Sequence, residues 1–600
     1  MPGGLLNIAA YGNLNVILNG NPSKTFFKST YAKYTNFGLQ KFRIDYNGLK
    51  TLRLTDDSVF NFKVINNGDL LMDTYFCVDL PNIYSPIYSP STNPFDPSMS
   101  YVQPYEFKWI ENLGFSMIRK VRLMIDGLII QEFTGQYLYN MVQRDFSAEK
   151  KQLIDEMVGN TAEFNDPANY NNRNGNYPSA SNNNYGVNDW TTGPEPSIRG
   201  RAIYIPINIF SSLVSTQALP LIALEYNKVY IEVTCRPICE LFVIRDVSWL
   251  HEAATQSKML DPSGIAWNIP NRYTYYNPPY IAPDFNNPAH QMFYFLQAPP
   301  YNQYYVTGTP ADNNNIKGTY LNISNDWNQG IYLLCNYAFL DEQERKFFAG
   351  KSQSYLIKQV HEETTYNVLG TQRVQLENQG LIVSWMWNLQ RTDVNLRNEW
   401  TNYSNWEYKT MPYPCVVTAD LNPSNPNAYP PEYPVPSLFN TQTHNYNNLF
   451  ITGPFHIENA HNIMTSWGLL IDGKVRETTF DADIVNYTEK YMRTVGHAKS
   501  GIYCYNFCLT TDPFSIEPTG AINLSKFTNI EFEYSTIQPF DLSYISHQQQ
   551  LITCENDNNN EILGVDKPNI MDYLYRYNLH IMQERYNLLT FDNGMAHLVF

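Results

Sequence analysis

The stretch "LLIDGKVRE" at residues 469–477 has the pattern of a β-hairpin, and "LMIDGLIIQE" at residues 123–132 repeats that pattern much earlier in the chain. In both stretches an Asp-Gly pair is flanked by alternating apolar residues. Gly tolerates the positive φ that a tight primed turn requires, so each pair predicts a two-residue hairpin turn. A similar hairpin at two distant places indicates that the chain repeats itself.

Three further pairs of segments recur in the same order along the chain. The first pair consists of strands with one strongly apolar face at period two. Each segment of the second pair is long and ends in a strand in which apolar residues alternate with polar ones. Both segments of the third pair end in "QER". The pairs are "DLLMDTYFCVDLP" (69–81) with "GLIVSWMWNLQ" (380–390), residues 203–233 with 502–534, and "NYAFLDEQER" (336–345) with "RYNLHIMQER" (576–585). Four recurring blocks in one order predict two related β-domains.

Each Asp-Gly hairpin runs into a helical pattern. The first pattern covers residues 136–159, and the second is "ADIVNYTEKYMRTVG" at residues 482–496. At a period of 3.6 the second pattern places one apolar stripe along its helix. The stripe consists of Ile484, Thr488, Tyr491, Met492 and Val495.

The composition of the 600 residues favours β structure with long polar loops over a helical protein. Aromatic residues make up 15% and charged residues only 16%, while 37 Pro and 30 Gly divide the chain into short pieces. Eight Cys are few for this length, which suits buried thiols in a reducing compartment. Cys235/Cys239 and Cys504/Cys508 share a C-x3-C spacing, and positions i and i+4 of a strand lie about 13 Å apart, too far for a disulfide.

The net charge of −16 argues against direct contact with nucleic acid, because a phosphate backbone would be repelled and no basic cluster offsets the charge. No apolar run is long enough to span a bilayer. The N-terminus lacks the basic start of a signal peptide, and Pro2 stands where myristoylation needs Gly. We therefore expect synthesis in the cytosol.

The repeat divides the chain into an N-terminal arm, residues 1–27, a first domain, 28–345, and a second domain, 346–600. Long polar insertions interrupt both domains, and segments of this length usually form a functional surface. The first insertion of each domain falls between its first and second blocks, so both should leave at the same end of their domains. The insertions are residues 82–104, 159–200 and about 250–330 in the first domain, and 398–448 in the second.

Several motifs, taken in order, resemble the major capsid protein of nucleocytoplasmic large DNA viruses, of the giant-virus and algal-virus type. The resemblance covers essentially the whole chain. Its motifs are "GGLLNIAAYGNLNVILNGNPSKTFFKSTYAKYTNF" at the N-terminus, "ALPLIALEYNKVYIEVTCRPICEL", "NYAFLDEQERKFFAG", "YLIKQV" and "EPTGAINLSKF".

The resemblance implies an all-β fold of two consecutive eight-stranded antiparallel jelly rolls, with short helices and long surface loops. It further implies a homotrimer that forms a pseudo-hexagonal capsomer. Such capsomers tile the icosahedral shell of a large double-stranded DNA virus. The expected partners are neighbouring capsomers, minor capsid and penton proteins and an inner membrane layer, with no direct nucleic acid. The expected location is the virion, after synthesis and assembly in the host cytoplasm.

Two other functions remain open at this point. A scaffold of the same fold could shape a viral membrane and then be shed. A carbohydrate-active β-sandwich enzyme could use the Tyr-rich loops to bind sugars. The N-terminal arm also has two interpretations: a frayed lead-in, or an arm tucked under the capsomer. Its apolar residues favour the second: Leu5, Leu6, Ile8, Val16, Ile17 and Leu18.

The sequence predicts no catalytic, cofactor or metal site, and hence no enzyme. His361-Glu362-Glu363 lacks the second His of H-E-x-x-H, and His456 and His461 are wrongly spaced for one helical face. No phosphate-binding loop or nucleophile elbow is present. Among four N-x-S/T sequons, only Asn322 and Asn402 fall outside predicted strands and helices, and they are the candidate glycosylation sites.

Overall fold

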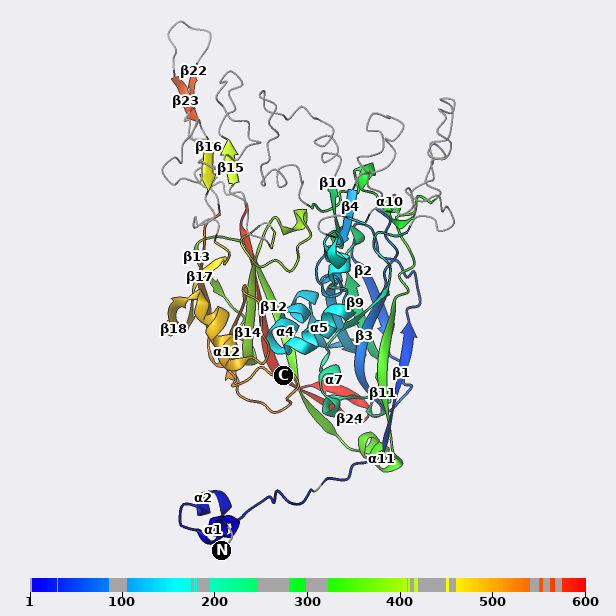
Figure 1. Ribbon diagram of the computed structural model, residues 1–600, viewed down its shortest axis with the longest axis vertical. Coiled ribbons are helices and arrows are strands. Elements are labelled where there is room, and N and C mark those ends of the chain that lie inside the picture. Colours follow the sequence, from blue (N-terminus) through cyan, green and yellow to red (C-terminus); the bar gives the residue numbers. More distant parts are fainter. Residues whose placement is uncertain are drawn as a thin grey trace.

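The computed structural model shows two β-sandwiches side by side, with the N-terminal helices beyond one end and several two-stranded sheets at the other (Figure 1). Helices α1 (Gly3–Ala9) and α2 (Val16–Asn19) form the N-terminal arm. The structure describes residues 3–29, 31–85, 105–173, 177–178, 180, 195–246, 280–297, 322–406, 408–409, 415–418, 449–452, 460–539, 550–553, 562–566 and 575–599.

The first sandwich consists of two facing antiparallel sheets. One sheet has the order β1-β11-β3-β7, with β8 beside β3, and the other has the order β2-β9-β5-β6. Their bounds are β1 (Phe37–Asp45), β2 (Ser58–Lys63), β3 (Leu70–Asp79), β5 (Ile118–Ile125), β6 (Leu128–Phe133), β7 (Ala202–Pro206), β8 (Leu219–Pro220), β9 (Val229–Cys235) and β11 (Tyr332–Leu340).

The second sandwich repeats this arrangement strand for strand. Its sheets have the orders β12-β24-β14-β19, with β20 beside β14, and β13-β21-β17-β18. The bounds are β12 (Gln353–Val368), β13 (Thr371–Gln375), β14 (Leu381–Arg391), β17 (Met464–Ile471), β18 (Lys474–Asp481), β19 (Ile502–Asn506), β20 (Ile522–Asn523), β21 (Ile530–Thr536), β24 (Tyr577–Asp592) and β25 (Met595–Leu598), which pairs with β24. The predicted double jelly roll is confirmed.

All four repeated blocks fall on equivalent strands. The hairpins at Asp126-Gly127 and Asp472-Gly473 join β5 to β6 and β17 to β18. Asp126 and Gly127 have φ of 50° and 88°, and Asp472 and Gly473 have 48° and 72°, as a primed turn requires. The other blocks place β3 with β14, β7–β9 with β19–β21, and β11 with β24.

Short helices fill the connections. They are α3 (Leu113–Met117), α4 (Gly135–Asp145), α5 (Ala148–Met157), α6 (Ala162–Asn165), α7 (Phe210–Leu213), α10 (Phe293–Leu296), α11 (Glu342–Gly350), the π-helix η12 (Ile484–Thr488) and α12 (Glu489–Arg493). Single 3-10 turns are η2 (Tyr170–Asn172), η3 (Ser215–Gln217), η4 (Leu221–Ala223), η5 (Ile238–Glu240), η7 (Pro288–His290), η9 (Val394–Leu396) and η13 (Leu524–Lys526). The predicted helical pattern at 136–159 is two helices, because Ser147 caps the second by accepting a bond from Lys150 N.

Two-stranded sheets mark the end at which the insertions leave. They are β4 (Tyr105–Trp109) with β10 (Phe242–Asp246), β15 (Cys415–Thr418) with β16 (Leu449–Thr452), and β22 (Gln550–Thr553) with β23 (Ile562–Asp566). All three lie at the same end of the molecule in Figure 1. The sequence predicted one common end for the first insertion of each domain, but β22 and β23 belong to none of the predicted insertions. Large parts of the four predicted insertions lie outside the described residues.

The buried residues differ from the expected pattern on one strand. Val229, Ile231 and Val233 alternate buried with partly exposed positions, as predicted. On β14, however, almost every residue is buried, although one apolar face was expected. Trp385 and Trp387 face the core of the second sandwich, whereas Met386 belongs to the core cluster of the first. The strand therefore has two buried faces because the first sandwich covers its outer side.

Candidate functional site

Helix α4 packs between the two sandwiches, and its N-terminus is tied to the second one. Backbone N of Thr134 donates to Glu362 Oε1 at 2.7 Å, and Thr134 Oγ1 donates to Glu362 Oε2 at 2.8 Å. The same hydroxyl oxygen caps the helix by accepting a bond from Tyr137 N. Burial raises the pKa of Glu362, although the two bonds from Thr134 oppose that shift.

The C-terminal end of α4 carries a buried ionic network. Arg144 Nη2 lies 2.7 Å from Asp145 Oδ2 and 2.8 Å from Glu584 Oε1 on β24, and the three side chains are 1%, 1% and 2% exposed. Tyr137 donates to Glu584 at 2.9 Å, and Thr511 donates to Asp145 at 2.5 Å. Burial is the largest influence and would raise the pKa of Glu584, but the charges of Arg144 and Lys358 and the hydrogen bonds from Ser384 and Arg144 together hold that pKa below its usual value.

Edge strands of the two sandwiches are bridged by amide side chains. Gln131 Nε2 on β6 donates to the carbonyl of Lys358 at 2.7 Å, and Gln359 Nε2 on β12 donates to the carbonyl of Ile130 at 2.6 Å. These bonds satisfy edge-strand carbonyls that would otherwise be unpaired. The surface formed by β6 and α4 is therefore bound closely to the outer side of the sheet that contains β12, β24 and β14.

The equivalent surface of the second sandwich is exposed. It is formed by β18, η12 and α12, which correspond to β6 and α4 in the repeat. Among the described residues, none covers most of the apolar stripe predicted from the sequence. The large apolar side chains exposed on the surface of β18, η12 and α12 and just beyond it are Val475 (60% exposed), Tyr487 (51%), Tyr491 (90%), Met492 (52%) and Val495 (56%). The prediction of one regular helix is wrong: η12 is a π-helix, α12 ends at Arg493, and Val495 lies beyond it. The buried residues of this segment include Ala482, Val485 and Lys490.

The surface equivalent to β12 is exposed as well. It belongs to β1, where only Ile44 is buried. Phe37 and Leu39 point away from the core and are 53% and 52% exposed, and Tyr204 on β7 of the same sheet is 38% exposed. Both halves of the contact between the sandwiches thus recur as uncovered surfaces elsewhere on the described part of the chain.

The N-terminal arm has no buried residues in either helix. Large apolar side chains along it are exposed, among them Ile8 (75%), Ile17 (79%), Leu18 (87%) and Phe27 (98%). The arm lies beyond the end of the molecule opposite the two-stranded sheets (Figure 1). It is thus available for contact with other molecules.

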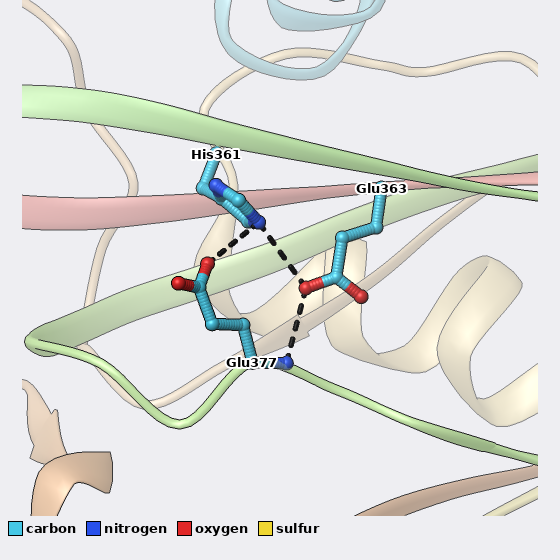
Figure 2. Close-up of side chains that lie close together, drawn as sticks. All are labelled: His361, Glu363 and Glu377. Carbon is cyan, nitrogen blue, oxygen red and sulfur yellow. Dashed lines mark hydrogen bonds and ion pairs between the residues drawn. The ribbon is translucent and has the colours of Figure 1, made fainter.

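One cluster of metal-ligating side chains lies on β12 and in the loop between β13 and β14 (Figure 2). His361 Nε2 is 2.7 Å from Glu377 Oε2 and 3.2 Å from Glu363 Oε1. Burial would raise the pKa of Glu363, but the bonds from His361 and from Glu377 N lower it. Sequence reasoning missed the cluster, because Glu377 is joined to the other two only by the folding of the loop.

The two predicted glycosylation sites differ in environment. Asn322 is exposed, and its side-chain oxygen accepts a bond from Ser324 N. Asn402 is 6% exposed, and its Nδ2 donates to Glu399 Oε2 and to the carbonyl of Trp406. A glycan on Asn402 would replace one of the two Nδ2 hydrogens and break at least one of these bonds. Both sites stay predictions, and Asn402 is the less accessible of the two.

Six cysteines among the described residues are free thiols, including both C-x3-C pairs. Burial raises the pKa of Cys504 and of Cys239 to about 11, so neither is a reactive thiolate near neutral pH. Within the described ranges, no helix is long and apolar enough to cross a membrane.

Comparisons with known proteins cover most of the chain. The family profile described as "Major capsid protein N-terminus" matches residues 25–271, and the profile "Large eukaryotic DNA virus major capsid protein" matches residues 344–597. A major capsid protein of Chrysochromulina ericina virus is 30% identical over 280 residues, 43% of this chain and 45% of that protein. The matched segment thus spans less than half of this relative's length.

Two longer matches extend along nearly the whole chain. Probable capsid protein 4 of Acanthamoeba polyphaga mimivirus is 22% identical over 574 residues, which are 89% of this chain and 92% of that protein. The structure of the Faustovirus major capsid protein aligns with a TM-score of 0.53 at 10% identity, covering 98% of this chain and 96% of that one. The structural match supports the double jelly-roll fold.

Proposed function

Because this chain belongs to the family of major capsid proteins of large eukaryotic DNA viruses, we propose that three copies assemble into a pseudo-hexagonal capsomer, and that such capsomers tile the icosahedral shell of a double-stranded DNA virus. The role is structural rather than catalytic. Each jelly roll closes two sheets over one core and leaves short edges, which makes a rigid block suited to tiling.

The proposal of a trimer is supported by two exposed surfaces that are equivalent to the two surfaces in contact between the sandwiches. Inside one chain, the surface of β6 and α4 binds the outer side of the sheet that contains β12. The surface of β18 and α12 is equivalent to that of β6 and α4, and it is exposed. The outer side of β1 and β7 is equivalent to that of the sheet containing β12, and it is exposed as well. The free surface of one molecule can therefore bind the free sheet of the next.

Such a contact is heterologous, since two different surfaces meet. A heterologous contact gives a closed ring when the rotations that relate successive molecules add up to a full turn. Three chains supply six sandwiches. Around the closed ring, three contacts within chains alternate with three contacts between chains. Obligate interfaces of this kind bury upwards of ~2,000 Å². The exposed Tyr491 and Met492 would then become buried, as Tyr137 and Met141 of α4 already are.

We extend the proposal to the organisation of the chain and to its partners. The arm is residues 1–27, and the two jelly rolls are residues 28–345 and 346–600; the boundary falls within α11, between the last strand of one set of sheets and the first of the other. Minor capsid and penton proteins, neighbouring capsomers and an inner membrane layer are the proposed partners. The exposed apolar arm favours an inner contact. Synthesis and assembly would take place in the host cytoplasm.

Native molar mass, measured by light scattering coupled to gel filtration, tests the proposal. We expect a species of three times 69.5 kDa, and Tyr491→Asp should convert it to a folded monomer. The matched control is Ile323→Asp, which changes a side chain of 74% exposure in the insertion before β11 and should leave the trimer intact. A wild-type monomer over a wide concentration range would refute the capsomer.

A further inference from the structure

The cluster of His361, Glu363 and Glu377 is built by the fold rather than by chance proximity on a surface. His361 and Glu363 are alternate residues of β12, so they share one side of the strand. Glu362, between them, points to the opposite side and binds Thr134. Glu377 is fixed in place because its backbone N donates to Glu363 Oε1 at 3.0 Å.

We propose that His361, Glu363 and Glu377 bind a divalent transition-metal ion, with Zn²⁺ as the ion that fits their chemistry. Imidazole nitrogen and carboxylate oxygen are both ligands of Zn²⁺, whose bonds to them are about 2.0 to 2.2 Å. Bonds of that length place neighbouring donor atoms roughly 3 to 3.5 Å apart. The three donor atoms already lie within 4.8 Å of one another, and Figure 2 shows both carboxylates directed at the imidazole.

The surroundings of the cluster support its carboxylates without filling it. Arg585 Nη2 lies 3.0 Å from Glu377 Oε2, and Gln583 Nε2 donates to Glu363 Oε1 at 3.3 Å. Such outer contacts orient ligating carboxylates and are typical of protein metal sites. The side chains of His361, Glu363 and Glu377 are 38%, 24% and 33% exposed, so an ion can enter from solvent.

A bound ion would join the loop between β13 and β14 to β12. The Glu362 carboxylate, on the other side of β12, holds the N-terminus of α4 and thereby the first sandwich. The ion would therefore stiffen the strand on which the contact between the sandwiches depends. This inference does not rest on the capsomer, because every residue involved belongs to one chain.

The alternative is an ion pair alone, in which a protonated His361 bridges the two carboxylates. Calorimetric titration of the full-length, chelator-treated protein with ZnCl₂ separates the two. We expect one equivalent of Zn²⁺ to bind and the melting temperature to rise. His361→Ala and the isosteric Glu377→Gln should each weaken binding at least about tenfold. The control His597→Ala removes an exposed histidine elsewhere and should leave binding unchanged.

Titrations with Mn²⁺ and Ca²⁺ test the preference of the site for Zn²⁺. Mn²⁺ should bind more weakly than Zn²⁺, following the general order of divalent metal affinities. Ca²⁺, which prefers oxygen ligands, should bind weakest. Absence of Zn²⁺ binding in the wild type would overturn the proposal and leave the ion pair. Equal Zn²⁺ binding in His361→Ala, Glu377→Gln and the wild type would also overturn it, and so would an equal response to Ca²⁺.

Discussion

Helices α4 and α12 occupy the same place in the two jelly rolls, yet ten of the eleven residues of α4 are buried whereas Tyr491 of α12 is 90% exposed. The difference comes from what covers each helix, because both follow the same hairpin in the same sheet order. The first helix has its partner within the chain. The second presents a similar apolar surface to solvent, and the difference between two repeated helices is the basis on which we propose a contact between chains.

The largest expected effect comes from breaking the ionic network at the end of α4. Arg144→Met leaves Asp145 and Glu584 buried without a compensating charge, and we expect a loss of about 3–5 kcal/mol in the free energy of unfolding. Urea denaturation measures it. Thr511→Val, which removes one hydrogen bond to Asp145, should cost about 1–3 kcal/mol and is the milder variant if the first does not fold.

The control for this network is Lys346→Met on α11. Lys346 pairs with Glu342, but the two side chains are 75% and 83% exposed. Exposed pairs contribute about 0–1 kcal/mol. Equal losses for Arg144→Met and Lys346→Met would mean that burial between the sandwiches does not determine the strength of the ionic network.

The second prediction tests whether the exposed surfaces are two halves of one contact. Tyr491→Asp damages the α12 surface and Leu39→Asp damages the β1 surface, so each variant alone should be monomeric. A mixture retains one intact surface of each kind on different chains. We expect light scattering of the mixture to show an open dimer of twice 69.5 kDa that cannot close into a ring. A trimer in the mixture, or only monomers, would contradict the pairing of these surfaces.

The third prediction compares the beginnings of the two helices. Thr134 caps α4 and binds Glu362, whereas Thr488, at the start of α12, has no side-chain cap bond. Thr134→Val should therefore lower the free energy of unfolding by about 1–2 kcal/mol. Thr488→Val should change it by no more than about 0.5 kcal/mol. Thermal or urea unfolding of both variants measures the difference, and equal effects would show that the tie to Glu362 adds nothing.

Much of the fold could be predicted from the sequence because the repeat is carried by local signals. The Asp-Gly turns and the period-two strands are set by neighbouring residues, and they give the strand equivalence that the structure confirms. The outer burial of β14 could not be predicted, since Met386 is covered by residues distant in the chain. The same holds for the sites: Tyr491 was identified as apolar but not as exposed, and Glu377 joins His361 only through a loop.

The smallest expected effect distinguishes the two Asp-Gly turns. Asp472 Oδ1 accepts bonds from Asn529 N, Thr528 N and Thr528 Oγ1, each 2.8 Å long, and these bonds lower the pKa of Asp472 below its ordinary value of 3.8. Asp126 accepts one longer side-chain bond, 3.3 Å from Asn227. A carboxylate whose pKa is lower in the folded state stabilises it above the unfolded pKa, and this contribution is lost as the pH falls through the folded pKa. Asp472→Asn should therefore flatten the decline of melting temperature below pH 3.8 more than Asp126→Asn does. The same flattening in both variants would mean that the bonds from Thr528 and Asn529 do not set the difference between the turns.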